Sequence, residues 1–175
     1  MARLPIDGYG VVELNNCAFR RDGRIEAQCA LDEDKFSKMA PCENGMVVAV
    51  DKLNGKITIH TTGALPLALV YSTEHMYDER HKALSDFANF PGSFLPRVGY
   101  LSIGDTFTTY TLSSSVVSSF EELAEEEDYG YCVPAADGSW EQVATAPQSG
   151  LYCKIVKMYT VPSGKPGVKL QVIRV

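Results

Sequence analysis

The stretch from Glu43 to Thr62 constrains the fold more than any other part of the sequence. Its apolar run from Met46 to Val50 is followed by Asn54-Gly55 and then by the β-branched residues Ile57-Thr58-Ile59. Asn-Gly accepts the positive φ values that a tight hairpin turn requires, and β-branched residues suit the pleated surface of a strand. We therefore expect a β-hairpin here and a β-rich fold for the chain.

Further strand signals follow at short intervals, separated by turn residues such as Gly, Pro and Asp-Gly. The last one alternates, with Val168 and Leu170 on one side and Lys169 and Gln171 on the other. Such alternation is typical of a strand with one packed and one solvated face. Strands are expected at 67–71, 98–103, 106–112, 139–145, 151–161 and 167–175. This pattern favours a mainly β fold, a small β-barrel or sandwich with one or two short inserted helices.

Three segments have helical signals. Residues 32–39 begin with three acids, which favour the first turn of a helix. Residues 74–87 follow Ser72 and Thr73, either of which can cap a helix. Residues 118–121, Ser-Ser-Phe-Glu, offer a capping box for a short helix whose outer face is acidic.

Residues 1–40 differ from the rest, because their apolar residues are scattered singly without a sustained helical or strand period. One interpretation is an extended arm that lies on a partner or a neighbouring subunit. The second is an N-terminal strand on the main sheet, and the third is plain disorder, which the aromatic and aliphatic content makes less favoured. The first divides the chain into an N-terminal arm, 1–40, and a β-rich domain, 41–175.

The formal net charge is −6, and one short stretch supplies as many acids. Without this stretch the chain is near neutral, and no basic stripe is present to neutralise phosphates. We therefore expect no nucleic-acid partner and no binding to an anionic membrane surface. The sequence has neither an apolar signal region nor an uninterrupted apolar run of about 20 residues, so a cytoplasmic site of synthesis is expected. The acids are Glu121, Glu122, Glu125, Glu126, Glu127 and Asp128.

No motif in the sequence predicts site chemistry. The five cysteines are widely and irregularly spaced without a Cys-x-x-Cys pair, which favours free thiols over a metal site. His75 and His81 are six residues apart, a spacing that does not place two ligands on one helix face. Nucleophile-elbow and phosphate-loop motifs are absent from the sequence. We expect no catalytic residues, no metal ligands and no cofactor, and an enzyme is the least favoured class.

The surroundings of the hairpin resemble a known family. A polar N-terminal segment is followed by Ala40-Pro41, a strand that closes on Asp51, a return strand from Gly55-Lys56-Ile57, and the apolar run Pro66 to Val70. Over about residues 40–71 this pattern resembles the head decoration (cement) proteins of tailed bacteriophages, of the lambda type. The fold that this resemblance implies is β-tulip-like with an extended N-terminal arm.

The same resemblance implies a virion structural protein, assembled in the host cytoplasm, that binds the outer surface of a phage capsid and stabilises it. The major capsid protein would be its partner, and self-association as a trimer is favoured. The arm would pair with capsid strands by β-augmentation. The alternatives are another phage head–tail or tail component, or a non-viral β-rich binding module. The apolar anchors of the arm would be Leu4, Ile6, Tyr9, Val11 and Phe19, and its polar contacts Arg20, Arg21 and Arg24.

Overall fold

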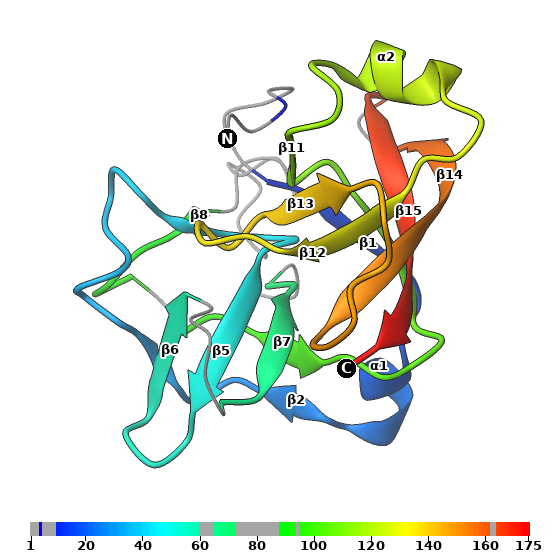
Figure 1. Ribbon diagram of the computed structural model, residues 1–175. Helices are drawn as coiled ribbons and strands as arrows, with labels where there is room; N and C mark the ends of the chain where they lie inside the picture. The colour runs from blue at the N-terminus through cyan, green and yellow to red at the C-terminus, as the bar shows by residue number, and fades with distance from the viewer. Residues whose placement is uncertain (1–3, 5–9, 60–64, 73–87, 94, 162–163) are drawn as a thin grey trace.

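Two β-sheets pack face to face in the computed structural model (Figure 1), which describes residues 4, 10–59, 65–72, 88–93, 95–161 and 164–175. The larger sheet has the order β1 (Val12–Asn16), β10 (Thr106–Thr109), β15 (Pro166–Arg174), β14 (Tyr152–Thr160), β12 (Tyr131–Pro134), β13 (Trp140–Val143) and β11 (Leu112–Ser114). The smaller sheet has the order β2 (Ile25–Glu26), β9 (Val98–Tyr100), β7 (Leu67–Val70), β5 (Val47–Asp51), β6 (Lys56–Ile59) and β3 (Ala30–Leu31). A separate pair joins β4 (Cys42–Glu43) to β8 (Ala88–Asn89), and the described residues form two helices, α1 (Ala18–Asp22) and α2 (Phe120–Glu125).

This arrangement confirms the expected fold class as a mainly β sandwich with two short helices. The expected hairpin is β5–β6, in which Val50 pairs with Ile57 and Gly55 has a φ of 64°. The Asp51 carboxylate accepts hydrogen bonds from the backbone N–H groups of Leu53 and Asn54, which fixes the turn. The strands expected further along the chain are found as β7, β9, β10, β13, β14 and β15.

The central core lies between the two sheets and is rich in aromatic side chains. Phe107 from β10 and Trp140 from β13 are fully buried, with ring centroids 5.5 Å apart. The Trp140 indole N–H donates to the carbonyl oxygen of Gly45 at 3.0 Å. Because Gly45 lies two residues before β5 of the smaller sheet, this bond joins the two layers as well as satisfying a buried donor.

A second core lies on the opposite face of the smaller sheet. Along β5, Val47 belongs to the central core, whereas Val48 and Val50 belong to the second one. The second core is covered by residues such as Leu31 and Phe36, which lie in the segment before the hairpin. The central strands of the smaller sheet are therefore buried on both faces, which explains their nearly continuous apolar sequence.

The described part of residues 1–40 belongs to the same body as residues 41–175, so it does not extend as a free arm. Strand β1 pairs with β10 at the edge of the larger sheet, which corresponds to the alternative of an N-terminal strand. Phe19 from α1 is fully buried, with its ring 5.0 Å from that of Tyr71, and a Cβ atom at Gly99 would collide with it. The physical reason is that burial of a large apolar side chain in its own core stabilises a fold by roughly 1.5–3 kcal/mol.

The helix expected at 118–121 is confirmed as α2, with Ser119 as its N-cap. The brief helix expected over residues 32–39 is wrong, because the chain makes a turn after Asp32 and then bends. There the Ser37 hydroxyl accepts hydrogen bonds from the backbone N–H groups of Met39 and Ala40, which competes with helical bonding. The helix expected over 74–87 lies outside the described residues.

Candidate interaction surface

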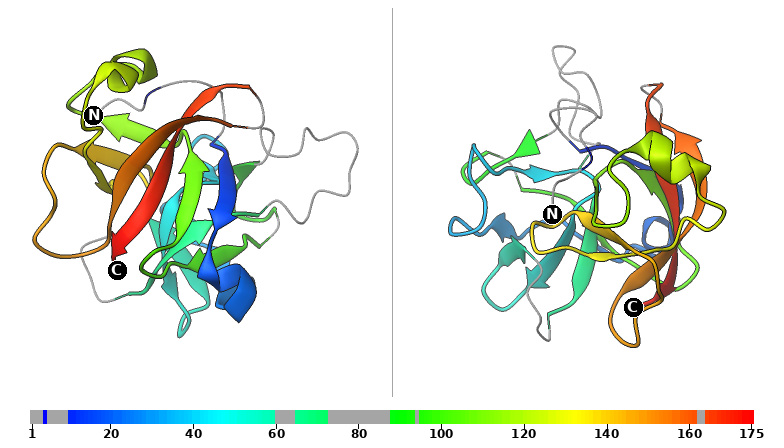
Figure 2. Two further views of the ribbon diagram at one scale, coloured as in Figure 1. Left: turned by 90° about the vertical axis from the view of Figure 1, so that its right-hand side faces the viewer. Right: turned by 45° about the horizontal axis from the view of Figure 1, so that its top comes forward.

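The outward face of the larger sheet carries tyrosine and lysine side chains along β12, β14 and β15. Lys154 alternates with the buried Cys153 and Ile155, so it points away from the core. Between Ile155 and Lys157 the Cα register shifts, which leaves Val156 as the extra residue of a β-bulge. We call this surface the tyrosine–lysine face, and it consists of Tyr131, Tyr152, Lys154, Lys157, Tyr159 and Lys169. Figure 2 shows the long β14–β15 pair on this side of the molecule, with α1 and α2 at its opposite ends.

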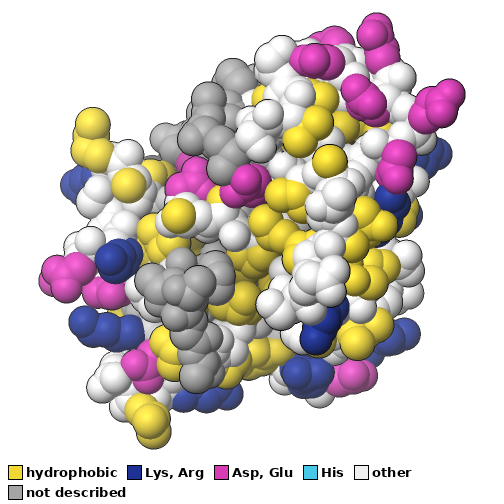
Figure 3. All heavy atoms as spheres, viewed as in Figure 1, with side chains coloured by type: hydrophobic (Ala, Val, Ile, Leu, Met, Phe, Trp, Pro, Cys, Tyr) yellow, Lys and Arg dark blue, Asp and Glu magenta, His cyan; other side chains and the backbone are white. Residues whose placement is uncertain are grey.

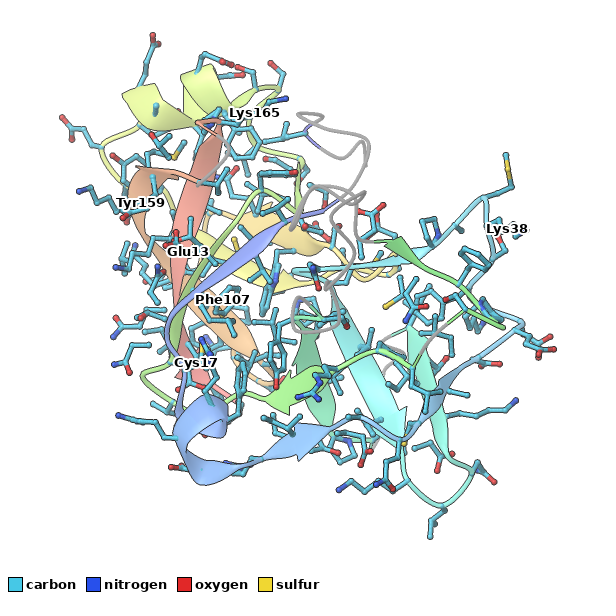
Figure 4. All side chains as sticks on the ribbon, turned by 180° about the vertical axis from the view of Figure 1, so that it is seen from behind. Glu13, Cys17, Lys38, Phe107, Tyr159 and Lys165 are labelled. Carbon is cyan, nitrogen blue, oxygen red and sulfur yellow. The ribbon has the colours of Figure 1, made fainter. Side chains whose placement is uncertain are left out.

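The lysines of this face lie over tyrosine rings. Lys154 Nζ is 4.4 Å from the centroid of the Tyr131 ring, and that ring meets Tyr152 edge to face at 5.9 Å. Tyr159, labelled in Figure 4, has Lys157 Nζ at 6.0 Å and Lys169 Nζ at 5.8 Å from its centroid. Like charges opposite each other destabilise a strand pair, and Lys157 pairs directly with Lys169. The electron-rich ring between them lowers this repulsion.

A second surface, the acidic segment 121–128, begins with α2. The helix is fixed from beneath by Phe120 and Leu123, both buried in the central core. Its first turn is capped twice, because Ser119 Oγ accepts from the Glu122 N–H at 3.1 Å while the Glu122 carboxylate accepts from the Ser118 N–H at 2.7 Å. The hydrogen bonds that the Ser118 N–H and hydroxyl groups donate to the Glu122 carboxylate lower the pKa of Glu122. Figure 3 shows the acidic side chains gathered over the helix at the upper right of the molecule.

The charges of the two surfaces are only partly neutralised within the chain. Asp128 forms an ion pair with Lys154, and this contact lowers the pKa of the Asp128 carboxyl group. Across the part of the chain that the structure describes, no cation pairs with the exposed Glu121 or Glu125. Carboxylates near a helix C-terminus are unfavourable. Helix α2 ends at Glu125, and its last turn contains no basic residue that would offset this charge. An excess of negative charge therefore remains close to Lys157 and Lys169, which form no ion pair within the described residues.

A hollow of about 620 Å³ separates the acidic segment from the tyrosine–lysine face. We call it the helix–hairpin hollow. One wall comes from α2 and carries the Glu121 carboxylate, and the other comes from β14 and β15 and carries Lys157 and Tyr159. Its remaining lining residues are Phe120, Ala124, Met158, Thr160, Gly164 and Pro166.

A larger crevice of about 660 Å³ opens between the ends of the two sheets. Leu67, Leu101 and Leu151 line it and continue the central core toward the surface. Arg24 stands at its edge, where its guanidinium group donates to Ser102 Oγ at 3.0 Å. The volume falls in the range of small-molecule sites, but the crevice has one arginine as the only charged side chain among its described lining residues.

The described cysteines do not form a nucleophilic site. Burial, with a smaller contribution from the nearby Asp105 carboxylate, raises the pKa of the Cys17 thiol to about 12. Burial also raises the pKa of Cys42, Cys132 and Cys153. Thiols with such pKa values stay protonated at neutral pH, and a protonated thiol is a poor nucleophile.

No metal site is formed by the residues that the structure describes. Within them, no group of three or more His, Cys, Asp or Glu side chains is placed to hold an ion. All three histidines, His60, His75 and His81, lie outside these residues.

The eight residues singled out from the sequence do not form one surface. Leu4, Val11 and Phe19 are buried in the central core, where they cannot act as exposed anchors in this conformation. The arginines, in contrast, are exposed at and just after α1, at the opposite end of the larger sheet from α2 (Figure 2). Ile6 and Tyr9 lie outside the described residues, and the three arginines are Arg20, Arg21 and Arg24.

Sequence reasoning missed the tyrosine–lysine face, although part of its signal was present. The alternation of Lys169 and Gln171 with apolar residues predicted an open face on β15. On β14 the bulge at Val156 interrupts the alternation, so the outward series does not stand out. Which residues meet across the strands depends on the pairing register, which a single sequence does not contain.

Comparisons with known proteins do not identify a relative: no family model, no curated protein and no solved structure matches the chain. Among the described helices, none has the length and apolar character needed to cross a membrane. The surfaces are therefore interpreted from their own geometry.

Proposed function

We propose that this protein is a virion structural protein that binds the outer surface of a phage capsid and stabilises it, with the major capsid protein as its partner. The observation that supports this proposal best is the tyrosine–lysine face, an array of partly or fully exposed side chains on the outer side of the larger sheet. Tyrosine is enriched where proteins bind one another, because its ring offers a large contact area and its hydroxyl group a polar contact. Lysines around such a contact steer the approach of an acidic partner.

The segment that resembles lambda-type decoration proteins also contributes to this proposal. Residues 40–71 supply β4, β5, β6 and β7, so three of its four strands are neighbours in the smaller sheet. In this arrangement the smaller sheet is the buried support, and the larger sheet is the layer that faces a partner. A capsid repeats the same surface many times, so that contacts of modest affinity suffice to coat it.

The attachment proposed here differs from an arm that pairs with capsid strands. Leu4, Val11 and Phe19 already stabilise the central core, and releasing them to bind a partner would expose that core to water. Attachment through the tyrosine–lysine face leaves the fold unchanged. A second candidate is a β-rich binding module, including a phage head–tail or tail component, and the apolar crevice beside Arg24 favours it.

Co-sedimentation with expanded capsids tests the proposal. The capsids are assembled from the major capsid protein encoded nearest to this gene. Wild-type protein is expected to sediment with them, and combining Tyr131→Ala with Tyr152→Ala is expected to weaken binding at least tenfold. The matched control combines Met39→Ala with Leu53→Ala, which removes two side chains that are 95% and 99% exposed elsewhere on the molecule.

Two outcomes would contradict this proposal. Wild-type protein that stays in the supernatant over all capsid concentrations rejects the decoration function itself. Loss of binding on combining Arg20→Ala with Arg21→Ala, with the tyrosine variant unchanged, would instead place the attachment site at α1. The near-ultraviolet circular dichroism of each variant shows whether its core is intact.

A further inference from the structure

We infer that the helix–hairpin hollow is a self-association surface, in which two copies of this chain meet around a two-fold axis. The acidic wall of each copy lies on the lysine wall of the other. This inference goes beyond the proposed function, because the contact requires no capsid, and it replaces the trimer that the resemblance to decoration proteins implies.

The charges on the two walls of the hollow, and directly beside these walls, are unbalanced. Glu121 and Glu125 are exposed and lack a described cationic partner, and Glu125 lies at the unfavourable C-terminal end of α2. On the other wall, Lys157 lines the hollow, and Lys169 lies directly opposite it across the strand pair, with a tyrosine ring rather than a carboxylate beside the two lysines. Contact with a surface of opposite charge therefore stabilises each wall. In the dimer, the lysine wall of the second copy meets the acidic wall, and its acidic wall meets the lysine wall.

The two walls lie next to each other on the molecule. They border the same hollow, with Glu121 on one side and Lys157 on the other. When two complementary patches lie side by side, a two-fold axis between them brings each patch onto its complement in the other copy, and the contact closes. Complementary patches at opposite ends of the molecule would produce an open chain instead.

Apolar surface lies between the charged groups of the two walls. Val156 is 43% exposed and Tyr159 is 38% exposed on the hairpin, and Met158 and Pro166 line the hollow beside them. Burial of this surface provides the part of the association that salt does not screen. The charges provide orientation and a dependence on ionic strength.

The ion pair between Asp128 and Lys154 shows the kind of contact that we expect between copies. It joins the end of the acidic segment to the tyrosine–lysine face within one chain. Because Lys154 is thereby neutralised, the lysines available to the second copy are Lys157 and Lys169. The Tyr131–Tyr152 pair contributes no lining residue to the hollow, so in the dimer this pair is the part of the tyrosine–lysine face that stays available for the capsid.

Charge exchange tests this inference, with analytical ultracentrifugation of purified protein as the measurement. One variant combines Lys157→Glu with Lys169→Glu, and the other combines Glu121→Lys with Glu125→Lys. The wild-type protein is expected to form a dimer at low ionic strength and to dissociate in molar salt. Each variant alone is expected to be a monomer, because both of its walls then carry the same charge.

An equimolar mixture of the two variants is the decisive sample. In a mixed pair, both contacts again join an acidic wall to a basic wall, so the dimer is expected to return. The matched control combines Arg20→Glu with Arg21→Glu, which changes the net charge as much as the lysine variant does but at the far end of the sheet. This control is expected to remain a dimer.

Three results would overturn the inference. The first is a wild-type protein that is monomeric at low salt at every concentration tested, and the second is a mixture that stays monomeric while both variants are folded. The third is a wild-type trimer, which excludes the two-fold arrangement. The test is independent of the capsid experiment: a dimer that fails to bind capsids contradicts only the proposed function, and a monomer that coats them contradicts only this inference.

Discussion

The two sheets of this sandwich differ in what lies on their outer sides. Strand β5 of the smaller sheet sends Val47 into the central core and Val48 into the second core, so neither of its faces meets water. Strand β15 of the larger sheet buries Val168 and Leu170 but points Lys169 outward. The first strand has consecutive apolar residues, and the second alternates. Two strand patterns in one chain thus report two environments, one covered on both sides and one open to a partner.

A strand buried on both faces requires a cover, even when no segment of the sequence stands out as one. Here the cover is supplied by residues before the hairpin, including Leu31 and Phe36. Their apolar side chains are too sparse to show a period, because each fills one gap over an existing sheet. The residues before the hairpin, which have the weakest hydrophobic pattern, are therefore required to cover the strands of the smaller sheet, which have the strongest.

The most severe way to test this comparison is to delete residues 1–40. The deletion removes β1 and Phe19 from the larger sheet and the central core, and it uncovers the second core. We expect the remaining chain to lose its cooperative unfolding transition, because several large side chains would become exposed at once. Circular dichroism during thermal unfolding measures this. A sharp transition close to that of the full chain would show that the segment is dispensable and would support its interpretation as an extended arm.

Single truncations measure how much each region contributes to the free energy of unfolding. Phe19→Ala in the central core is expected to lower the free energy of unfolding by about 3–5 kcal/mol, since its ring packs on Gly99 and leaves a cavity that the sheets cannot close. Phe36→Ala is expected to cost less, because the cover over the second core can relax into the space. Tyr159→Ala, on the open face, is expected to change the free energy of unfolding by less than about 1 kcal/mol. Urea denaturation of the three variants gives the ranking, and equal costs at Phe19 and Phe36 would contradict the distinction between a core and a cover.

Alkaline pH is expected to lower the free energy of unfolding through the ionisation of a buried thiol in the central core. Burial raises the pKa of Cys17 from 9.0 to about 12. Because the pKa is higher in the folded state, the stability that the protonated thiol contributes is complete below pH 9 and is lost between pH 9 and pH 12. At pH 11 the loss from this one thiol is about 2–3 kcal/mol. Urea unfolding at pH 8 and pH 11 should therefore show a larger decrease for the wild type than for Cys17→Ala, and parallel decreases would mean that Cys17 ionises freely.

Local chemistry explains what could be predicted from the sequence. The β5–β6 hairpin depends on Asn54-Gly55 and on the Asp51 carboxylate, all within a few residues. The start of α2 likewise depends on Ser119 and on Glu122 close by. These elements were predicted because the groups that fix them are neighbours along the chain.

The features that the sequence did not predict depend on contacts between residues far apart in it. Phe19 is a core residue because β9 carries Gly99, which leaves room for its ring. The lysines of the open face meet only through the register of β14 and β15. Neither contact has a local signal in the sequence. The sequence therefore did not predict that Leu4, Val11 and Phe19, expected as anchors on an arm, are buried, nor did it predict the surface that carries the proposed function.

The bond from the Trp140 indole to Gly45 gives the molecule an internal optical probe. Trp140 is the sole tryptophan of the chain, and it is fully buried between the layers. Its fluorescence therefore comes from one place, and separation of the layers would admit water to the ring and move the emission to longer wavelength. Any ligand, variant or solvent that opens the sandwich can thus be followed in real time without a label.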